Sequence, residues 1–163
     1  MVFATAVRLL GNEADAEDVA QTVFLKAFQR FAQIESSPAA AGWLKAVARN
    51  TCLNHLSRYR ARLRFFSELG SDRDAMGEEF EASLPSEIAP APLDERERHE
   101  QLEAALRALP DHQRVPLVLF HFEELSYQEI ASALGITLAK AKTDIHRGRN
   151  ALRTLLAGDH AAR

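Results

Sequence analysis

Residues Ser126–Leu156 read SYQEIASALGITLAKAKTDIHRGRNALRTLL, and this stretch decides the fold of the C-terminal part of the chain. Ser126 is a good helix N-cap, and Glu129 stands three residues on, where a capping box needs Glu or Gln. Gly135 follows the last apolar residue of that helix and predicts a left-handed turn. Thr137 can cap the helix that comes next. The stretch therefore predicts a helix-turn-helix.

The second helix of this unit has an apolar side and a basic side. Residues at steps of three and four are expected to face inward: Ala141, Ile145, Gly148, Leu152 and Leu155. The polar residues of its N-terminal half are expected to face outward: Lys140, Thr143, Asp144 and Arg147. An exposed basic half is what a recognition helix offers to the DNA major groove. A helical hairpin with a solvated charged face is the alternative.

Two helices are expected ahead of this unit. The first begins near His99 and ends at Pro110, and Asp111 is expected to cap the second. Pro116 lies inside the second helix, where it removes a backbone hydrogen bond or bends the first turn. The surface on which the helix-turn-helix packs is expected to consist of Leu117, Val118, Phe120 and Phe122.

Charge is unevenly distributed along the chain. Residues 1–64 carry nine Lys or Arg against five Asp or Glu, residues 65–100 carry three against eleven, and residues 101–163 carry eight against seven. Residues 65–98 also contain several Gly and Pro and lack a sustained helical period, so they predict an acidic flexible linker that does not fix the separation of its two domains. The formal net charge of -3 argues against tight DNA binding by the free chain.

The N-terminal part predicts three helices. Met1–Leu10 is expected to be the last turns of a helix that ends at Gly11, and acidic residues from Glu13 onward open the next one. Most of the apolar face of that next helix is assigned to the core: Val19, Val23, Phe24, Ala27, Phe28 and Phe31. Ser37 and Pro38 then begin a long helix that runs from about Ala39 to Arg60 or beyond. The fold class is therefore all-α, with two small helical domains.

The long helix carries candidate nucleic-acid contacts on the side away from its core residues. Trp43, Asn50, Asn54 and Ser57 fall within a narrow arc. Basic residues flank this arc: Lys45, Arg49 and Arg58. Tryptophan can stack on a base, asparagine can bond to base edges, and cations can hold phosphates. A partly buried tryptophan on a solvated helix is the alternative.

Several classes of function are not supported by the sequence. The single cysteine, Cys52, excludes a disulfide within the chain and a cysteine-rich zinc site. No arrangement of nucleophile, base and orienting residue, no metal cluster and no phosphate loop is apparent, so we expect no enzyme, catalytic residue, metal or cofactor. No apolar run is long enough to cross a bilayer, and the start has no basic leader, so we expect a cytoplasmic protein without membrane insertion.

Three blocks in order resemble the signature blocks of the extracytoplasmic-function (ECF) sigma factors of bacterial RNA polymerase: DAEDVAQTVFLKAFQRF, WLKAVARNTCLNHL and LPDHQRVPLVLFHFEELSYQEIASALGITLAKAKTDIHRGRNAL. The resemblance covers nearly the whole chain outside the linker. It implies that residues 1–64 are region 2, which binds polymerase and melts the downstream promoter element. It implies that residues 99–163 are region 4, which reads the upstream element, with 65–98 as the linker. The implied partners are core RNA polymerase at its clamp helices and flap region, promoter DNA and an anti-sigma factor.

The resemblance also assigns roles to residues. The match to the polymerase-binding helix consists of Asp15, Asp18, Gln21 and Phe24. The match to the helix that faces the captured bases consists of Trp43, Asn50 and Asn54. The match to the recognition helix consists of Lys140, Lys142, Thr143, Asp144 and Arg147.

The chain departs from the family pattern in a few places. Thr22 stands where glutamate is usual, Asp144 where a basic residue is common, and Gly148 where alanine is usual. Asp144 either accepts a hydrogen bond from a cytosine amine or weakens DNA binding. Family members generally begin a helix earlier, so the chain is expected to be a fragment or to have a late start.

Two rival functions fit parts of the sequence. A helix-turn-helix regulator that acts without core polymerase would explain the C-terminal unit, but it leaves the Asp15–Phe24 and Trp43–Asn54 blocks unexplained. A helical protein-interaction adaptor would support no promoter-dependent transcription.

Overall fold

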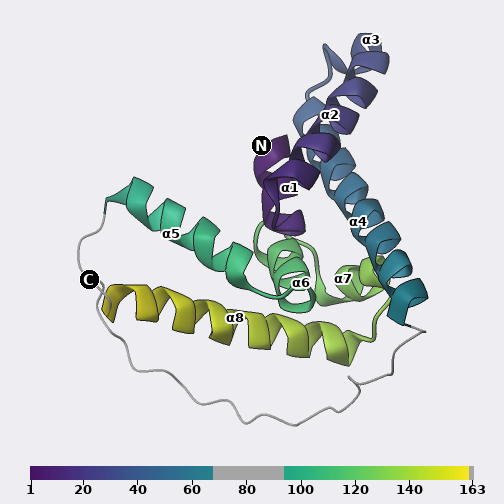
Figure 1. The fold of residues 1–163 in the computed structure, drawn as a ribbon. Helices are drawn as coiled ribbons and strands as arrows, with labels where there is room; N and C mark the ends of the chain where they lie inside the picture. The colour runs from purple at the N-terminus through teal and green to yellow at the C-terminus, as the bar shows by residue number, and fades with distance from the viewer. Residues whose placement is uncertain (68–93, 162–163) are drawn as a thin grey trace.

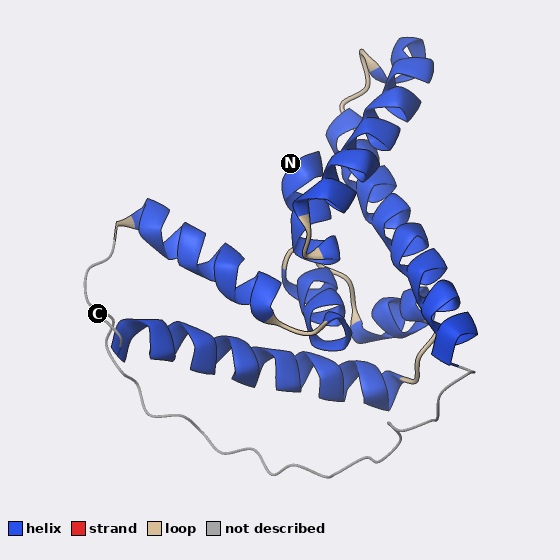
Figure 2. Ribbon diagram, viewed as in Figure 1, coloured by secondary structure: helices blue, strands red, loops and turns tan. Residues whose placement is uncertain are grey.

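The computed structural model describes the backbone of residues 1–67 and 94–161, and the side chains of residues 1–57 and 94–157. Within these ranges the protein is all-α, as predicted, and contains no strand (Figure 2). Its helices are α1 (Val2–Leu10), α2 (Glu13–Gln29), α3 (Phe31–Ile34), α4 (Ala40–Ser67), α5 (Glu95–Ala108), α6 (Asp111–His121), α7 (Tyr127–Leu134) and α8 (Leu138–Ala161).

The N-terminal half is built on α1, α2 and α4, which pack on one another. Leu9, Val23 and Cys52, one from each helix, are fully buried. Gly11 ends α1 in the left-handed conformation, at φ 73°, as predicted. Asn12 then caps α2 by accepting a hydrogen bond from the Asp15 amide at 3.0 Å. The α2 helix and the first half of α4 run side by side into an arm, with α3 at its far end (Figure 1).

The prediction that the core covers most of the apolar face of the expected second helix is wrong for Phe24 and Phe28 of α2 and for Phe31, the first residue of α3. Phe24, Phe28 and Phe31 are 56%, 79% and 58% exposed. The buried residues of α2 all lie in its first eleven positions, from Ala16 to Val23. The reason is geometric: α1 lies against the start of α2, and the rest of α2 projects past it into the arm (Figure 1).

The C-terminal half contains the predicted helix-turn-helix. The Ser126 hydroxyl accepts from the Glu129 amide at 3.3 Å, and the Glu129 carboxylate accepts from the Ser126 amide at 2.8 Å, so the capping box is confirmed. Gly135 ends α7 at φ 65°, also as predicted. The Thr137 hydroxyl accepts from the Lys140 amide at 3.2 Å and caps α8. Phe120 of α6 stacks on Tyr127 of α7 at 4.7 Å.

The start of α6 differs from the prediction. Asp111 is the first residue of the helix, and Pro110, in extended conformation, occupies the N-cap position. The Asp111 carboxylate is therefore free to accept from Arg114, one turn on, at 2.6 Å. Pro116 is buried within α6.

The two halves of the protein are in contact. The α1 helix packs on α6 and touches α5, so it lies between the arm and the C-terminal helices (Figure 1). This differs from the expected pair of domains without a fixed separation. Most of the predicted acidic linker, residues 68–93, lies outside the described residues. At its edges, α4 continues to Ser67 and α5 begins at Glu95.

Candidate nucleic-acid interface

The predicted polymerase-binding residues form a partly open surface on α2. Asp18, Gln21 and Phe24 are exposed at steps of three along the helix. Asp15 is engaged locally: its carboxylate accepts from the Asn12 side chain at 2.7 Å and lies 3.5 Å from the His55 ring. The surface thus offers an acidic group, an amide and an aromatic ring to another protein, while Asp15 also holds the start of α2 against α4.

The face of α4 that was predicted to meet bases is open at its two asparagines. Asn50 and Asn54 are exposed, and Trp43 is half-buried. The Arg30 guanidinium, at the end of α2, lies 6.0 Å from the centre of the Trp43 ring. Sequence reasoning missed Arg30, because its closeness to Trp43 comes from the turn that brings the end of α2 beside the start of α4. Cation–π contact of this kind is compatible with a ring that also stacks on a base.

Of the basic residues that flank this face on α4, Lys45 is bonded to the other half of the molecule. The Lys45 ammonium donates to the Phe122 carbonyl at 2.8 Å. Arg49 is half-buried, and its charge acts on the carboxylates of Glu123 and Glu129. The side chain of Arg58, the third predicted phosphate contact, lies outside the described residues. In this arrangement Lys45 faces protein.

Glu123 is the group that these cations surround. It is 6% exposed, it accepts from the Thr5 hydroxyl at 3.3 Å, and its Oε2 has no hydrogen-bond partner. Burial raises the pKa of this carboxyl, and the charges of Lys45, Arg49 and Arg8 and the hydrogen bond from Thr5 oppose that rise. Burial beside Glu123 likewise raises the pKa of Cys52 to about 12, so its thiol is not a nucleophile.

The residues of α8 that were assigned to DNA are exposed, with the exception of Asp144. Lys140, Lys142, Thr143 and Arg147 are exposed, as predicted. Asp144 does not lie outward: it is 3% exposed, and the Lys140 ammonium lies 3.2 Å from its carboxylate. Its position borders both faces of the helix, one residue from buried Ile145, so the side chain turns inward with Lys140 as its partner. Leu155, predicted to face inward, is 39% exposed in the last turns of α8.

The structure offers no cluster for other chemistry in the part of the chain that it describes. No group of three His, Cys, Asp or Glu side chains there could hold a metal ion. Among the described helices, none combines the length and the hydropathy needed to cross a membrane.

Two family models match the chain, each on one of its halves. The model described as Sigma-70 region 2 matches residues 1–62. The model described as Sigma-70, region 4 matches residues 99–152.

Known proteins resemble the chain over most of its length. The ECF RNA polymerase sigma factor SigE of Mycolicibacterium smegmatis is 36% identical over 161 residues, which are 96% of this chain. The chain spans only 57% of the length of that relative. The RNA polymerase sigma-E factor of Streptomyces coelicolor is 30% identical and is matched over 99% of this chain and 84% of its own length. Among solved structures, the sigma factor RpoE of Bartonella quintana, in complex with the anti-sigma factor NepR, matches with a TM-score of 0.52 and 26% identity, over 96% of this chain and 89% of that one.

Proposed function

Since this chain belongs to the ECF sigma factors of the sigma-70 family, we propose that it directs core RNA polymerase to specific promoters and helps to open the DNA there. The observation that carries the proposal is the order of the two matches, region 2 on residues 1–62 and region 4 on residues 99–152. The family is not a class of catalytic enzymes, and the protein's contribution is binding energy rather than covalent chemistry. It acts in the cytoplasm, where polymerase works.

Opening of the DNA strands costs free energy, which contacts with the exposed bases must offset. Each base-pair step that opens loses roughly 1.4 kcal/mol of stacking. Stacking of a freed base on an aromatic side chain returns about 1–3 kcal/mol. Half-buried Trp43 and exposed Asn50 and Asn54 support this role for α4, because one can stack on a base and the others can bond to base edges.

Region 4 supplies position on the upstream element. The exposed cations of α8 are suited to phosphate contacts, which fix register on the duplex: Lys140, Lys142 and Arg147. Exposed Thr143 is suited to a base edge. Asp144 is buried against Lys140 in this arrangement, which favours weak binding over readout of a cytosine amine.

Protein partners meet the other exposed surfaces. We assign Asp18, Gln21 and Phe24 on α2, with Asp15 as their anchor, to the clamp helices of polymerase, and region 4 to its flap region. The RpoE neighbour was solved with the anti-sigma factor NepR. By analogy, an anti-sigma factor that covers some of these surfaces would keep this protein inactive.

Run-off transcription from a promoter library tests the proposal. Core polymerase is assayed with and without the protein, and initiation from a defined set of promoters only in its presence is expected. The variant Asp18→Arg should weaken association with polymerase, because it reverses the charge of an exposed acidic contact. If the free protein instead shifts palindromic DNA in a gel and supports no transcription, the result favours a regulator that works without polymerase.

A further inference from the structure

The α1 helix of region 2 is joined to region 4 by direct polar contacts. The Thr5 hydroxyl donates to Glu123 at 3.3 Å. Arg114 of α6 donates through Nη2 to the carbonyl of Leu10, the last residue of α1, at 3.0 Å. These groups are buried, so each bond replaces hydration that the separated halves would recover.

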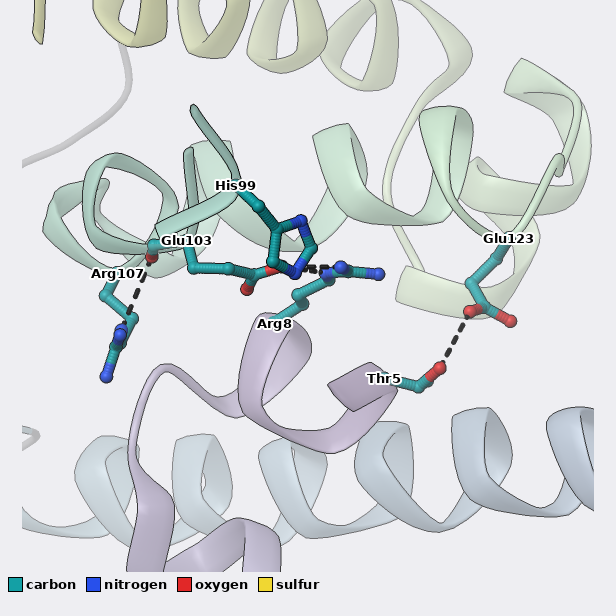
Figure 3. A network of polar contacts seen from close by, with 6 residues as sticks. All are labelled: Thr5, Arg8, His99, Glu103, Arg107 and Glu123. Atoms are coloured by element: carbon teal, nitrogen blue, oxygen red, sulfur yellow. Dashed lines mark hydrogen bonds and ion pairs between the residues drawn. The ribbon is translucent and has the colours of Figure 1, made fainter. Parts of the chain in front are cut away.

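Charged pairs reinforce this contact, and Figure 3 shows the pair of Arg8 with Glu103. Arg8 of α1 donates through Nε to Glu103 of α5 at 2.6 Å, and these side chains are only 17% and 16% exposed. The Arg8 guanidinium also lies 4.3 Å from the centre of the Phe122 ring. At the edge, Arg107 of α5 donates to Glu13 of α2 at 3.0 Å. We name the set Arg8–Glu103, Arg107–Glu13, Thr5–Glu123, Arg114–Leu10 and Lys45–Phe122 the clasp.

The clasp uses a residue that the proposed function needs elsewhere. Lys45, a candidate phosphate contact of region 2, donates to the Phe122 carbonyl of region 4 at 2.8 Å. Arg49, another candidate, is half-buried one helical turn further along α4. In this arrangement the half-buried Lys45 ammonium lies against region 4 and is not open to a DNA phosphate.

We propose that the clasp is an autoinhibitory contact: while Arg8 of region 2 is paired with Glu103 of region 4, Lys45 is withheld from promoter DNA, and the clasp must open before strand opening. This inference rests on the proposed function. The contact buries apolar residues of α1 and α6 in one core, and its ion pairs and hydrogen bonds join groups that regain hydration when the halves separate.

The test uses the full chain and acts on region 4 alone, away from the groups assigned to DNA. In the variant Glu103→Arg, two cations meet where a pair existed, so the clasp should open. Glu100→Arg is the matched control, because Glu100 lies on the same helix, is exposed, and pairs with Arg96 of that helix, at 2.9 Å. The double variant Arg8→Glu with Glu103→Arg restores an opposite-charge pair and should close the clasp again.

Two measurements are made on each variant. Small-angle scattering should give a larger radius of gyration for Glu103→Arg, and wild-type values for the control and the charge swap. Open-complex formation with core polymerase should be several-fold faster for Glu103→Arg alone. Circular dichroism checks that helix content is kept, and Glu103→Gln, which removes only the charge, decides the matter if Glu103→Arg does not fold.

The outcomes separate this inference from the proposed function. If Glu103→Arg scatters like Glu100→Arg, the clasp does not hold the halves together and the proposal is overturned. If the molecule expands but open complexes form no faster, the contact exists without inhibiting and the proposal is equally overturned. Failure of the wild-type protein to support any initiation would refute the sigma-factor function, and scattering would still report whether the clasp exists.

Discussion

At the scale of single residues, Gly11 shows how closely the two halves meet. A Cβ atom built on Gly11 would lie 2.5 Å from Arg114 Cζ, and Gly11 has φ 73°. The Arg114 guanidinium cannot simply move away, because it is buried and donates to the carbonyls of Leu109 and Leu10 and to Asp111. Gly135 has φ 65° and nothing within 4 Å of the same position. Comparison of Gly11 with Gly135 therefore separates the cost of a left-handed backbone from the cost of a steric clash.

We therefore expect Gly11→Ala to cost more stability than Gly135→Ala. Both variants pay about 1–2 kcal/mol for an L-residue in the left-handed region. Gly11→Ala additionally displaces Arg114 and disturbs its bonds to α1. Urea unfolding, followed by circular dichroism, measures both. Equal losses would mean that Arg114 adapts at no cost and that the contact at Gly11 is loose.

Asn50 allows a test of the DNA face of α4 without disturbing the core, because its side chain is exposed. Asn50→Ala should lower open-complex stability by about 1–3 kcal/mol, the usual worth of a good contact to a base edge. Polymerase binding should be unchanged, since the contacts assigned to polymerase lie on α2. Fluorescence of a base analogue at the opened position measures the first effect, and anisotropy with labelled protein the second. Loss of polymerase affinity in Asn50→Ala would remove Asn50 from the DNA face.

Glu123 makes stability depend on pH in a predictable direction. Burial raises its pKa above the ordinary value of 4.5, against the opposing effect of Lys45 and Arg49 from α4 and of Thr5 and Arg8 from α1. A group that binds its proton more tightly in the folded state contributes stability that is complete below its ordinary pKa and is lost as pH rises through the raised pKa. Wild-type melting temperature should therefore fall relative to Glu123→Gln as pH rises above 4.5. Parallel curves would show that the carboxylate is ionised in the folded protein at no cost.

At the scale of helices, local signals in the sequence predicted most boundaries. The capping box of α7, the glycines after α1 and α7, and the Thr137 cap of α8 are all present. Each depends only on residues within one turn of the chain. The exposure of Phe24 and Phe28 was not predictable, because periodicity identifies an apolar side of a helix but not the neighbour that covers it. The prediction that Asp144 faces outward is wrong for a related reason. A residue at the border of two faces takes its orientation from its partner, which here is Lys140.

The capping box gives the prediction that belongs to this scale. Ser126→Ala removes the hydroxyl that accepts from the Glu129 amide at 3.3 Å, and it should destabilise the protein by about 1 kcal/mol. The α7 helix has only eight residues, so loss of its N-cap hydrogen bond affects a large part of the helix. Ser132→Ala, exposed on the same helix, should change stability by less than about 0.5 kcal/mol. Equal effects in urea unfolding would show that the box does not hold the start of α7.

At the scale of the whole molecule, the contact between the halves was beyond sequence reasoning. Lys45 and Arg49 were predicted to hold phosphates because they flank an aromatic and amide face on one helix. The partner of Lys45, Phe122, lies 77 residues further along the chain, in a turn with no signal of its own. Composition indicated a linker, and a linker alone does not predict whether the domains that it joins touch.

This arrangement determines which cations the free protein can offer to DNA. Exposed Lys140, Lys142 and Arg147 are available on α8, whereas Lys45 is bonded to Phe122. With three phosphate contacts, the logarithm of affinity for duplex DNA that carries the upstream element should fall against the logarithm of salt concentration with a slope of about -2.7. Lys142→Ala should reduce the magnitude of that slope by about 0.9, and Lys45→Ala should leave it unchanged. Fluorescence anisotropy between about 50 and 200 mM salt measures both. A reduced slope in Lys45→Ala would mean that region 2 already contacts DNA in the free chain, so that the halves separate without polymerase.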